Sequence, residues 1–282
     1  MLAPCALPSA SPSDGWGAEL RVRLGLRHGR TRLLDASHRG PLRVQRAFHP
    51  EPDGAAHLVI LHPPAGLVGG DHLDVRARVD DGARALLTTT GAGKAYRSLG
   101  ATSVVDTHLD VGAGADLEHV PQETVIFDGA RAALTTRIAL APGARLLAWE
   151  VVCLGRPACG ERFERGGLRL RLEVEREGRL RFVERGRVEA GAAALDAPWG
   201  MAGFAAFGTL VSTEGSVDSL RDALADVPIT EARVGVTRVG ELSVVRVLGR
   251  DGAHARSLLE RARHRVRDAW SRPRVDPAIW RS

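Results

Sequence analysis

Ten side chains in the middle of the chain have the chemistry of metal ligands. They supply imidazole, thiolate and carboxylate groups, all of which suit divalent first-row metals. No pair has the short spacing of a closed structural metal site, so we expect most of them to be solvated residues of loops and strand edges. The ten are His57, His62, Asp71, His72, Glu118, His119, Glu123, Cys153, Cys159 and Glu161.

Three of these residues, His62, Asp71 and His72, lie within an unusual turn-rich segment, LHPPAGLVGGDHL (residues 61–73). Pro63 and Pro64 force an extended backbone, and the glycines that follow allow the backbone to turn. A strand that ends in such a loop aims His62 and Asp71 at a defined place. The pair has the chemistry of a general acid and base, but either side chain would also serve simply to satisfy backbone groups in a tight connection.

The segment TTTGAGKAYRS resembles a phosphate-binding loop at Gly93-Lys94 and fails in two places. Thr88 stands where the first glycine is needed for the tight backbone, and Ala95 stands where a hydroxyl would hold magnesium. The chain also has no GxSxG elbow and no HExxH zinc helix. These absences argue against nucleotide binding and against the common hydrolase motifs.

Lys94 is nevertheless unusual, because 38 of the 39 basic residues are Arg and it is the single Lys. A lone Lys in such a chain indicates either a site where a compact ammonium group is wanted or a chance surface residue. Tyr96, the only tyrosine, lies two positions away. In an extended segment both side chains point to the same face.

Composition narrows the class of protein. The pI is near 10, but the arginines are interleaved with 34 acidic residues along the chain. Aromatic residues make up only 4% of the chain. Nucleic-acid binders concentrate their positive charge and supply stacking platforms, so we expect no nucleic-acid partner. No apolar run is long enough to span a membrane. The start of the chain lacks the pattern of a secretory signal, and three cysteines without a CxxC motif fit a reducing cytoplasm.

Alternating hydrophobic segments bounded by turn dipeptides predict strands and hairpins over most of the chain. The clearest hairpin runs from Leu168 to Val174, turns at Glu177-Gly178 and returns through Phe182. Asp81-Gly82, Asp128-Gly129 and Pro142-Gly143 are further turn signals. Strands are predicted at 20–26, 57–62, 73–79, 84–90, 101–111, 115–120, 132–140, 144–153, 204–212, 231–238 and 242–249.

Helical periodicity appears only in the last third. One helix is predicted from Val217 to Leu224, with Ser216 as its cap, and a second carries an apolar stripe from Ala255 to Trp270. Arg263, Arg265 and Arg267 lie near the favourable C-terminal end of the second helix. The predicted fold is therefore a large, mainly β body with two C-terminal helices, in which the last strands and helices resemble part of a split βαβ unit. A flexible tail at 1–14 precedes a single domain at 15–282, with a seam near 196–203.

Five blocks of this sequence, taken together and in this order, resemble the UreD (UreH) family of urease accessory proteins. The resemblance is strong over residues 20–190 and fainter at RPRVDPAIW near the C-terminus. The blocks are LRVQRAFHPE (42–51), LHPPAGLVGGDHLDV (61–75), LTTTGAGKAYRS (87–98), LEHVPQETVIFDGAR (117–131) and WEVVCLGRPACGERFERG (149–166).

The resemblance implies a mainly β fold and a cytoplasmic protein that is not an enzyme. It implies binding to the urease apoprotein and, through UreF, to the GTPase UreG, in an assembly that inserts nickel into the urease active site. It implies no tightly bound cofactor, only nickel in transit.

We therefore predict a path of weak nickel ligands inside the β body, because an ion in transit must be held loosely enough to leave. Asp71 and Glu161 are the first candidates, and His62 and Glu123 the next, since carboxylates lie inside the loops that carry the family signature. Two alternatives stay open. One is a small hydrolase that uses His62 and Asp71, and the other is an interaction scaffold without any role for metal.

Overall fold

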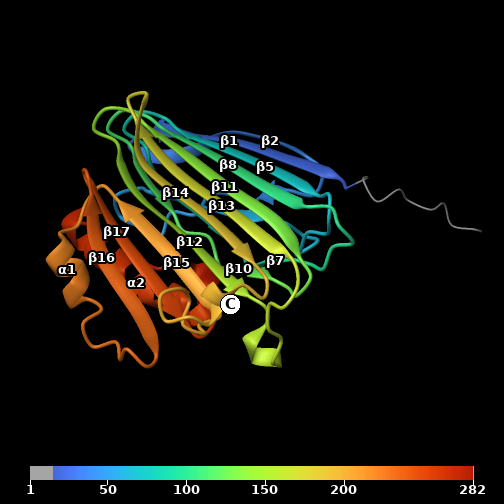
Figure 1. Ribbon diagram of the computed structural model, residues 1–282. Helices are drawn as coiled ribbons and strands as arrows, with labels where there is room; N and C mark the ends of the chain where they lie inside the picture. The colour runs from blue at the N-terminus through green and yellow to red at the C-terminus, as the bar shows by residue number, and fades with distance from the viewer. Residues whose placement is uncertain (1–14, 282) are drawn as a thin grey trace, which may run out of the picture.

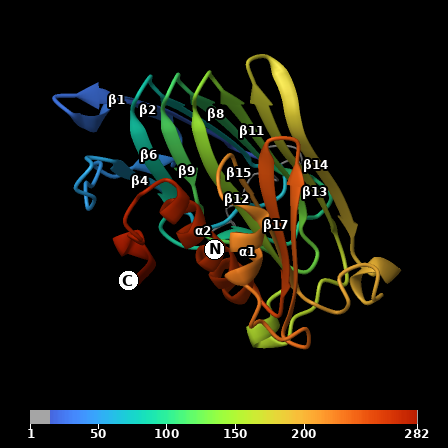
Figure 2. The same cartoon turned by 90° about the vertical axis from the view of Figure 1, so that its left-hand side faces the viewer.

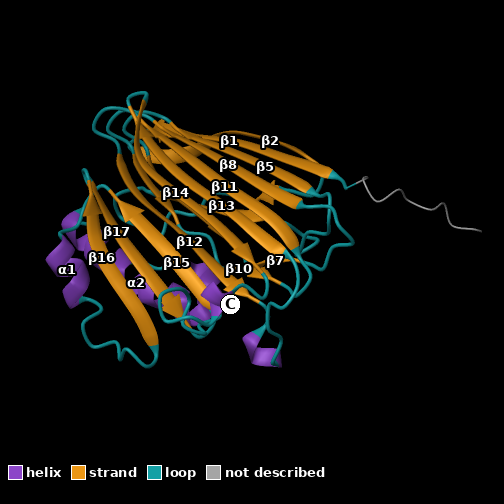
Figure 3. Cartoon of the chain, in the orientation of Figure 1, coloured by secondary structure: helices purple, strands orange, loops and turns teal. Residues whose placement is uncertain are grey.

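The computed structural model describes residues 15–281 and forms two β-sheets that face each other, with two α-helices against the outside of one sheet (Figures 1 and 3). The predicted tail at residues 1–14 lies outside the described residues. Within 15–281, no helix combines the length and the apolar character needed to cross a membrane.

Sheet A contains seven strands within the described residues. In spatial order they are β14 (Arg179–Glu189), β13 (Gly167–Arg176), β11 (Arg131–Leu140), β8 (Ser103–Val111), β5 (His72–Val79), β1 (Gly17–Arg27) and β2 (Arg30–Arg39).

Sheet B contains ten strands within the same range. Eight form a continuous series: β16 (Ala232–Val239), β17 (Leu242–Gly249), β15 (Ala206–Ser212), β12 (Arg145–Leu154), β9 (Asp116–His119), β6 (Arg84–Thr89), β4 (Ala56–Leu61) and β3 (Arg43–Val44). The other two are β10 (Thr124–Ile126), which pairs with β12, and β7 (Gly93–Ala95), which pairs with β10.

The centre of both sheets is parallel, because the chain winds from one sheet to the other and back in a solenoid-like path. Neighbours β4, β6, β9 and β12 are parallel in sheet B, and β1, β5, β8, β11 and β13 are parallel in sheet A. Parallel strands need a crossover connection, and here a strand of the opposite sheet provides it.

This winding corrects the prediction that the turn dipeptides form hairpins. Asp81-Gly82 joins β5 of sheet A to β6 of sheet B, and Pro142-Gly143 joins β11 to β12 in the same way. The signal at Glu177-Gly178 does form the predicted hairpin, between β13 and β14. A turn signal marks a reversal of the chain, but it does not determine whether the next strand pairs with its predecessor or faces it from the other sheet.

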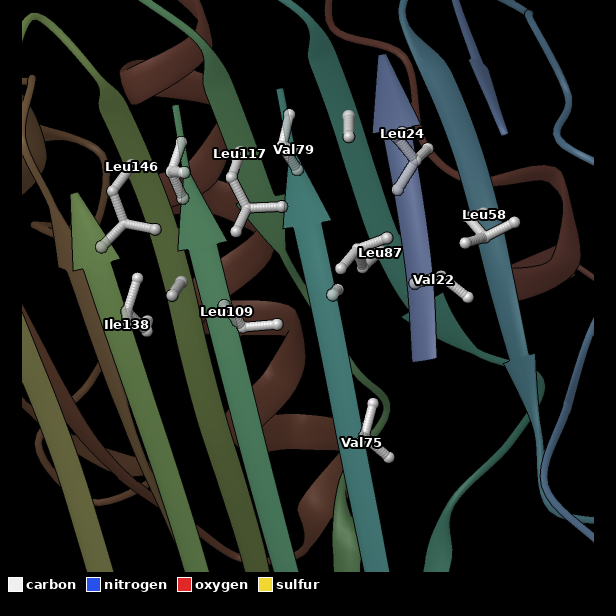
Figure 4. Packing of buried hydrophobic residues seen from close by; sticks show 14 of the residues in the cluster. Val22, Leu24, Leu58, Val75, Val79, Leu87, Leu109, Leu117, Ile138 and Leu146 are labelled. Carbon is white, nitrogen blue, oxygen red and sulfur yellow. The ribbon is translucent and has the colours of Figure 1, made fainter. Parts of the chain in front are cut away.

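The interior between the sheets is packed with aliphatic side chains from both (Figure 4). Leu24, Val79 and Leu109 of sheet A meet Leu87 and Leu117 of sheet B, and all five are essentially inaccessible to solvent. Each such side chain contributes roughly 1.5–3 kcal/mol through removal from water. The predicted strands fall on these elements with small changes of boundary, while β2, β3, β7 and β10 were not predicted.

The helices cover the outer face of sheet B (Figure 2). α1 (Val217–Asp222) is capped by Ser216, whose Oγ accepts from the Ser219 N–H at 3.1 Å, as predicted. α2 (Gly252–Ala269) begins after Asp251, whose Oδ1 accepts from the His254 N–H at 2.7 Å. The apolar stripe of α2, which its periodicity predicted, packs with Trp149 and its neighbours on β12.

Arg267 lies in the last turn of α2, as predicted, but the ion pairs of these arginines were not predicted. Arg263 and Arg267 are fully buried, and both are paired with Glu118 of β9. They therefore join the helix to the sheet, whereas the sequence suggested that they interact with the helix dipole. Arg265, the third member of the group, is partly exposed.

The last strands also differ from the predicted split βαβ unit. β15 pairs antiparallel with β12 and with β17, so the C-terminal segment extends sheet B. The predicted seam at 196–203 lies in the connection between β14 and β15.

Candidate functional site

Asp71 lies at the end of the Pro/Gly-rich loop and is almost completely buried. Its carboxylate accepts a hydrogen bond from the Val68 N–H at 2.9 Å and another from the Trp16 N–H at 3.3 Å. Ala65 and Gly70 adopt positive φ angles in the same loop. Asp71 therefore holds the loop in shape and ties it to the start of β1.

His62 lies at the other end of this loop, with its ring centroid 5.5 Å from that of Trp16. Its Nε2 is buried and has no hydrogen-bond partner. Burial lowers the pKa of His62, and the nearby charge of Asp71 opposes that shift. No hydrogen bond joins His62 to Asp71 within residues 15–281, although the charge of Asp71 acts on His62, and the acid–base pair of the hydrolase alternative stays a prediction.

The two other predicted ligands lie elsewhere and are bound to arginines. Glu161 pairs with Arg156, which lowers the pKa of Glu161, and it also accepts from the Asp128 N–H. Glu123 pairs with Arg256 of α2 at 3.1 Å. Within residues 15–281, no group of three or more His, Cys, Asp or Glu is placed to hold a metal ion together. The predicted nickel path through these four residues stays a prediction.

A cavity of about 310 Å³ lies between the sheets, beyond the packed aliphatic core. Sheet B contributes the ends of its parallel strands, and sheet A contributes the first halves of β5, β8 and β11. Its wall contains four titratable residues: His62, Lys94, His119 and Glu150. Thr89, Thr107 and Thr136 add hydroxyl groups, so the cavity has a polar lining inside an otherwise apolar interior.

His119 and Glu150 come from neighbouring parallel strands, β9 and β12, and both side chains face the cavity. Burial lowers the pKa of His119 to about 4, and its Nδ1 has no hydrogen-bond partner. Burial also raises the pKa of Glu150 to about 7; a hydrogen bond from Thr136 opposes this shift and the charge of Glu184 adds to it. Near neutral pH the cavity thus offers neutral imidazoles and a carboxyl group that is about half ionised.

The Glu150→Gln variant is expected to gain stability relative to the parent protein as pH rises. Between pH 4.5, the ordinary pKa of a glutamate, and pH 7 the folded protein retains a proton on Glu150 that the unfolded chain releases. Rising pH therefore destabilises the parent fold across this interval, by about 1–3 kcal/mol in total. Urea unfolding at pH 5 and pH 8 measures the difference. Glu175→Gln, at an exposed position of β13, is the control; an equal response of both variants would contradict the assigned pKa.

The sequence around Glu150 is itself unusual. Glu150 is an acidic residue within the segment LLAWEVVCL, which is otherwise apolar and lies in a central strand. A charged residue in a strand buried on both faces is expensive unless it has a function or a partner. His119 was among the ten candidate ligands but not among the four predicted residues.

The fold and the cavity define a β-solenoid scaffold with a polar interior, and comparison with known proteins shows its family. The family model described as UreD urease accessory protein matches residues 17–281. The chain is 41% identical to "Urease accessory protein UreD" of Dechloromonas aromatica, over 98% of both chains. It is 44% identical to the protein of that name from Alkalilimnicola ehrlichii, over 97% of this chain and 94% of that one. The chain belongs to the UreD family of urease accessory proteins, and the family resemblance and the mainly β fold are confirmed.

Proposed function

We propose that this chain acts in the cytoplasm as a non-catalytic scaffold that delivers nickel to the urease apoprotein. In this proposal it binds apo-urease and a UreF–UreG complex, and nickel insertion depends on GTP hydrolysis by UreG. The UreD family implies a role in urease maturation, and the partners and the metal belong to the proposal.

The observation that supports nickel passage is the chemistry of the cavity wall. His62 and His119 have unpartnered ring nitrogens, and neutral imidazole is a good ligand for nickel. The pKa of Glu150 is raised to about 7, so its carboxyl group is about half ionised near neutral pH. An approaching cation favours the ionised form. These groups are sparse and not clustered, so each binds the ion weakly, as passage requires.

Asp71, Glu161 and Glu123 stay predicted ligands outside the cavity wall. Each must release its present partner before it binds an ion: two main-chain N–H groups for Asp71, Arg156 for Glu161 and Arg256 for Glu123. Among the four original candidates, His62 is the one that lines the cavity.

Deletion of the gene is expected to abolish urease activation at limiting nickel while the urease subunits are still produced. Urea hydrolysis and the nickel content of purified urease are the measurements, and a plasmid copy of the gene should restore both. Co-purification of the tagged chain with urease, UreF and UreG tests the proposed partners. Normal urease activity in the deletion strain would refute the proposal, and urea hydrolysis by the isolated chain would favour the hydrolase alternative.

A further inference from the structure

The cavity opens to solvent at a mouth between two loops. The function proposed above gives this mouth no role. The lining residues Ala65 of one loop, Thr90 and Gly91 of the other, and Gly93 at the start of β7 are exposed to solvent. The loops are joined by hydrogen bonds of 2.8 Å, from the Leu67 N–H to the Lys94 carbonyl and from the Tyr96 N–H to the Leu67 carbonyl.

Tyr96 makes one side of this mouth rigid. A Cβ atom at position 66 would lie 2.2 Å from the Tyr96 ring, so the ring packs directly on the backbone of Gly66. The same ring makes an edge-to-face contact with Phe127 at 5.0 Å. Thus Tyr96 positions the His62–Leu67 loop, and Lys94, two residues earlier, lies at the mouth itself.

Among the described residues that line the cavity, Lys94 is the one that carries an ammonium group. The other titratable groups of the wall are the imidazoles of His62 and His119 and the carboxyl group of Glu150, which lies on β12. No ion pair of Lys94 is present within residues 15–281. Two acidic residues in the adjoining segments are already engaged: Asp71 with main-chain N–H groups and Glu123 with Arg256.

An unpaired ammonium group at the mouth opposes the entry of a divalent cation. At the effective dielectric of a protein surface, the repulsion between a unit charge and a doubly charged ion several ångströms away weakens binding of the ion roughly tenfold or more. A cavity that passes nickel therefore needs a negative charge beside Lys94, and residues 15–281 supply no ion-pair partner for it there.

We propose that Lys94 is the docking point for an acidic side chain of the partner protein that exchanges nickel with this chain. On docking, the carboxylate pairs with Lys94, cancels its charge and opens the cavity to the cation. In the free protein the positive charge keeps cations from entering from bulk water. This inference rests on the nickel path proposed above.

Three variants at this position test docking. Lys94→Met removes the charge, Lys94→Glu reverses it and Lys94→Arg keeps it; Arg97→Met, at an exposed position three residues along, is the matched control. Capture of urease, UreF and UreG by each tagged protein is measured at two salt concentrations. Lys94→Met is expected to weaken capture roughly tenfold and Lys94→Glu more, since a close charge pair is lost or made repulsive. Lys94→Arg and Arg97→Met should behave as the parent. Equal capture by all variants overturns the proposal.

Equilibrium dialysis of the isolated proteins against nickel(II) at pH 7.5 tests gating. Lys94→Glu supplies the missing carboxylate from the chain itself, so it is expected to retain nickel at least tenfold more tightly than the parent. Equal retention by the two proteins, including none by either, overturns gating. Normal urease activity in the deletion strain refutes the proposed function. If the deletion abolishes activation but the Lys94 variants capture their partners and retain nickel as the parent does, only this inference is refuted.

Discussion

The Arg267→Met variant is expected to lose about 3–5 kcal/mol of unfolding free energy, because it leaves buried carboxylates without a partner. Arg267 is completely buried, and its guanidinium pairs with Glu118 of β9 and with Glu51. Its Nε also donates to the Pro273 carbonyl at 2.7 Å. Urea unfolding followed by circular dichroism gives the free energy.

Arg265→Met is the matched control, since Arg265 lies two residues earlier on the same helix and has only a 3.9 Å surface contact with Asp268. Its replacement should change the unfolding free energy by no more than about 0.5 kcal/mol. Similar losses for the two variants would mean that the buried ion pairs do not hold α2 on the sheet.

These ion pairs connect parts of the chain that are far apart in the sequence. Burial alone would raise the pKa of Glu51, but the hydrogen bond from His57 and the charge of Arg267 lower it to about 2. Arg263 donates to Glu118 at 2.6 Å and to the Val275 carbonyl at 2.9 Å. The buried charges therefore fix how α2 and the segment that follows it lie on sheet B.

The second large effect is expected from Glu150→Gln, which removes the one carboxyl group among the described residues that line the cavity. Urease activity in cells grown at limiting nickel should fall about tenfold or more, since a passage through a low-dielectric interior depends on each group that compensates for lost hydration. Excess nickel should restore part of the activity. Glu150→Asp, which keeps the carboxylate, should retain more activity than Glu150→Gln.

Urease activity per milligram of urease, with the complex recovered in normal amounts, is the measurement for this variant. A Glu150→Gln protein that activates urease as well as the parent at limiting nickel would remove Glu150 from the path. It would also favour the interaction scaffold without a metal role, which predicts no sensitivity to neutralised polar residues.

The mainly β fold was predictable because strand periodicity is a local property. Segments such as 73–79 and 132–140 alternate strongly and became β5 and β11 nearly unchanged. The pairing was not predictable, because the parallel order of β4, β6, β9 and β12 depends on how successive turns of the solenoid stack. β2 was missed because it is an exposed edge strand with few buried residues.

The candidate site was only partly predictable for the same reason. His62 was identified because it adjoins a distinctive Pro/Gly-rich loop. His119 and Glu150 line the same cavity as His62 only because β9 and β12 align with the end of β4, and their own segments contain no sign of that alignment. RPRVDPAIW showed only a faint family resemblance, yet Trp280 within it stacks on Trp149 and donates to the Thr88 Oγ at 2.9 Å.

The most direct test of nickel passage through the cavity is the nickel content of urease purified from cells that carry Thr107→Trp. Thr107 lines the cavity on β8, and a Trp there fills space without removing any of the titratable groups. His108→Trp, the next residue and on the opposite face of the strand, is the matched control. We expect Thr107→Trp to form the complex with urease but to leave the enzyme largely without nickel, while the control loads it fully. Urease that acquires its full nickel content from the Thr107→Trp protein would contradict passage through this cavity.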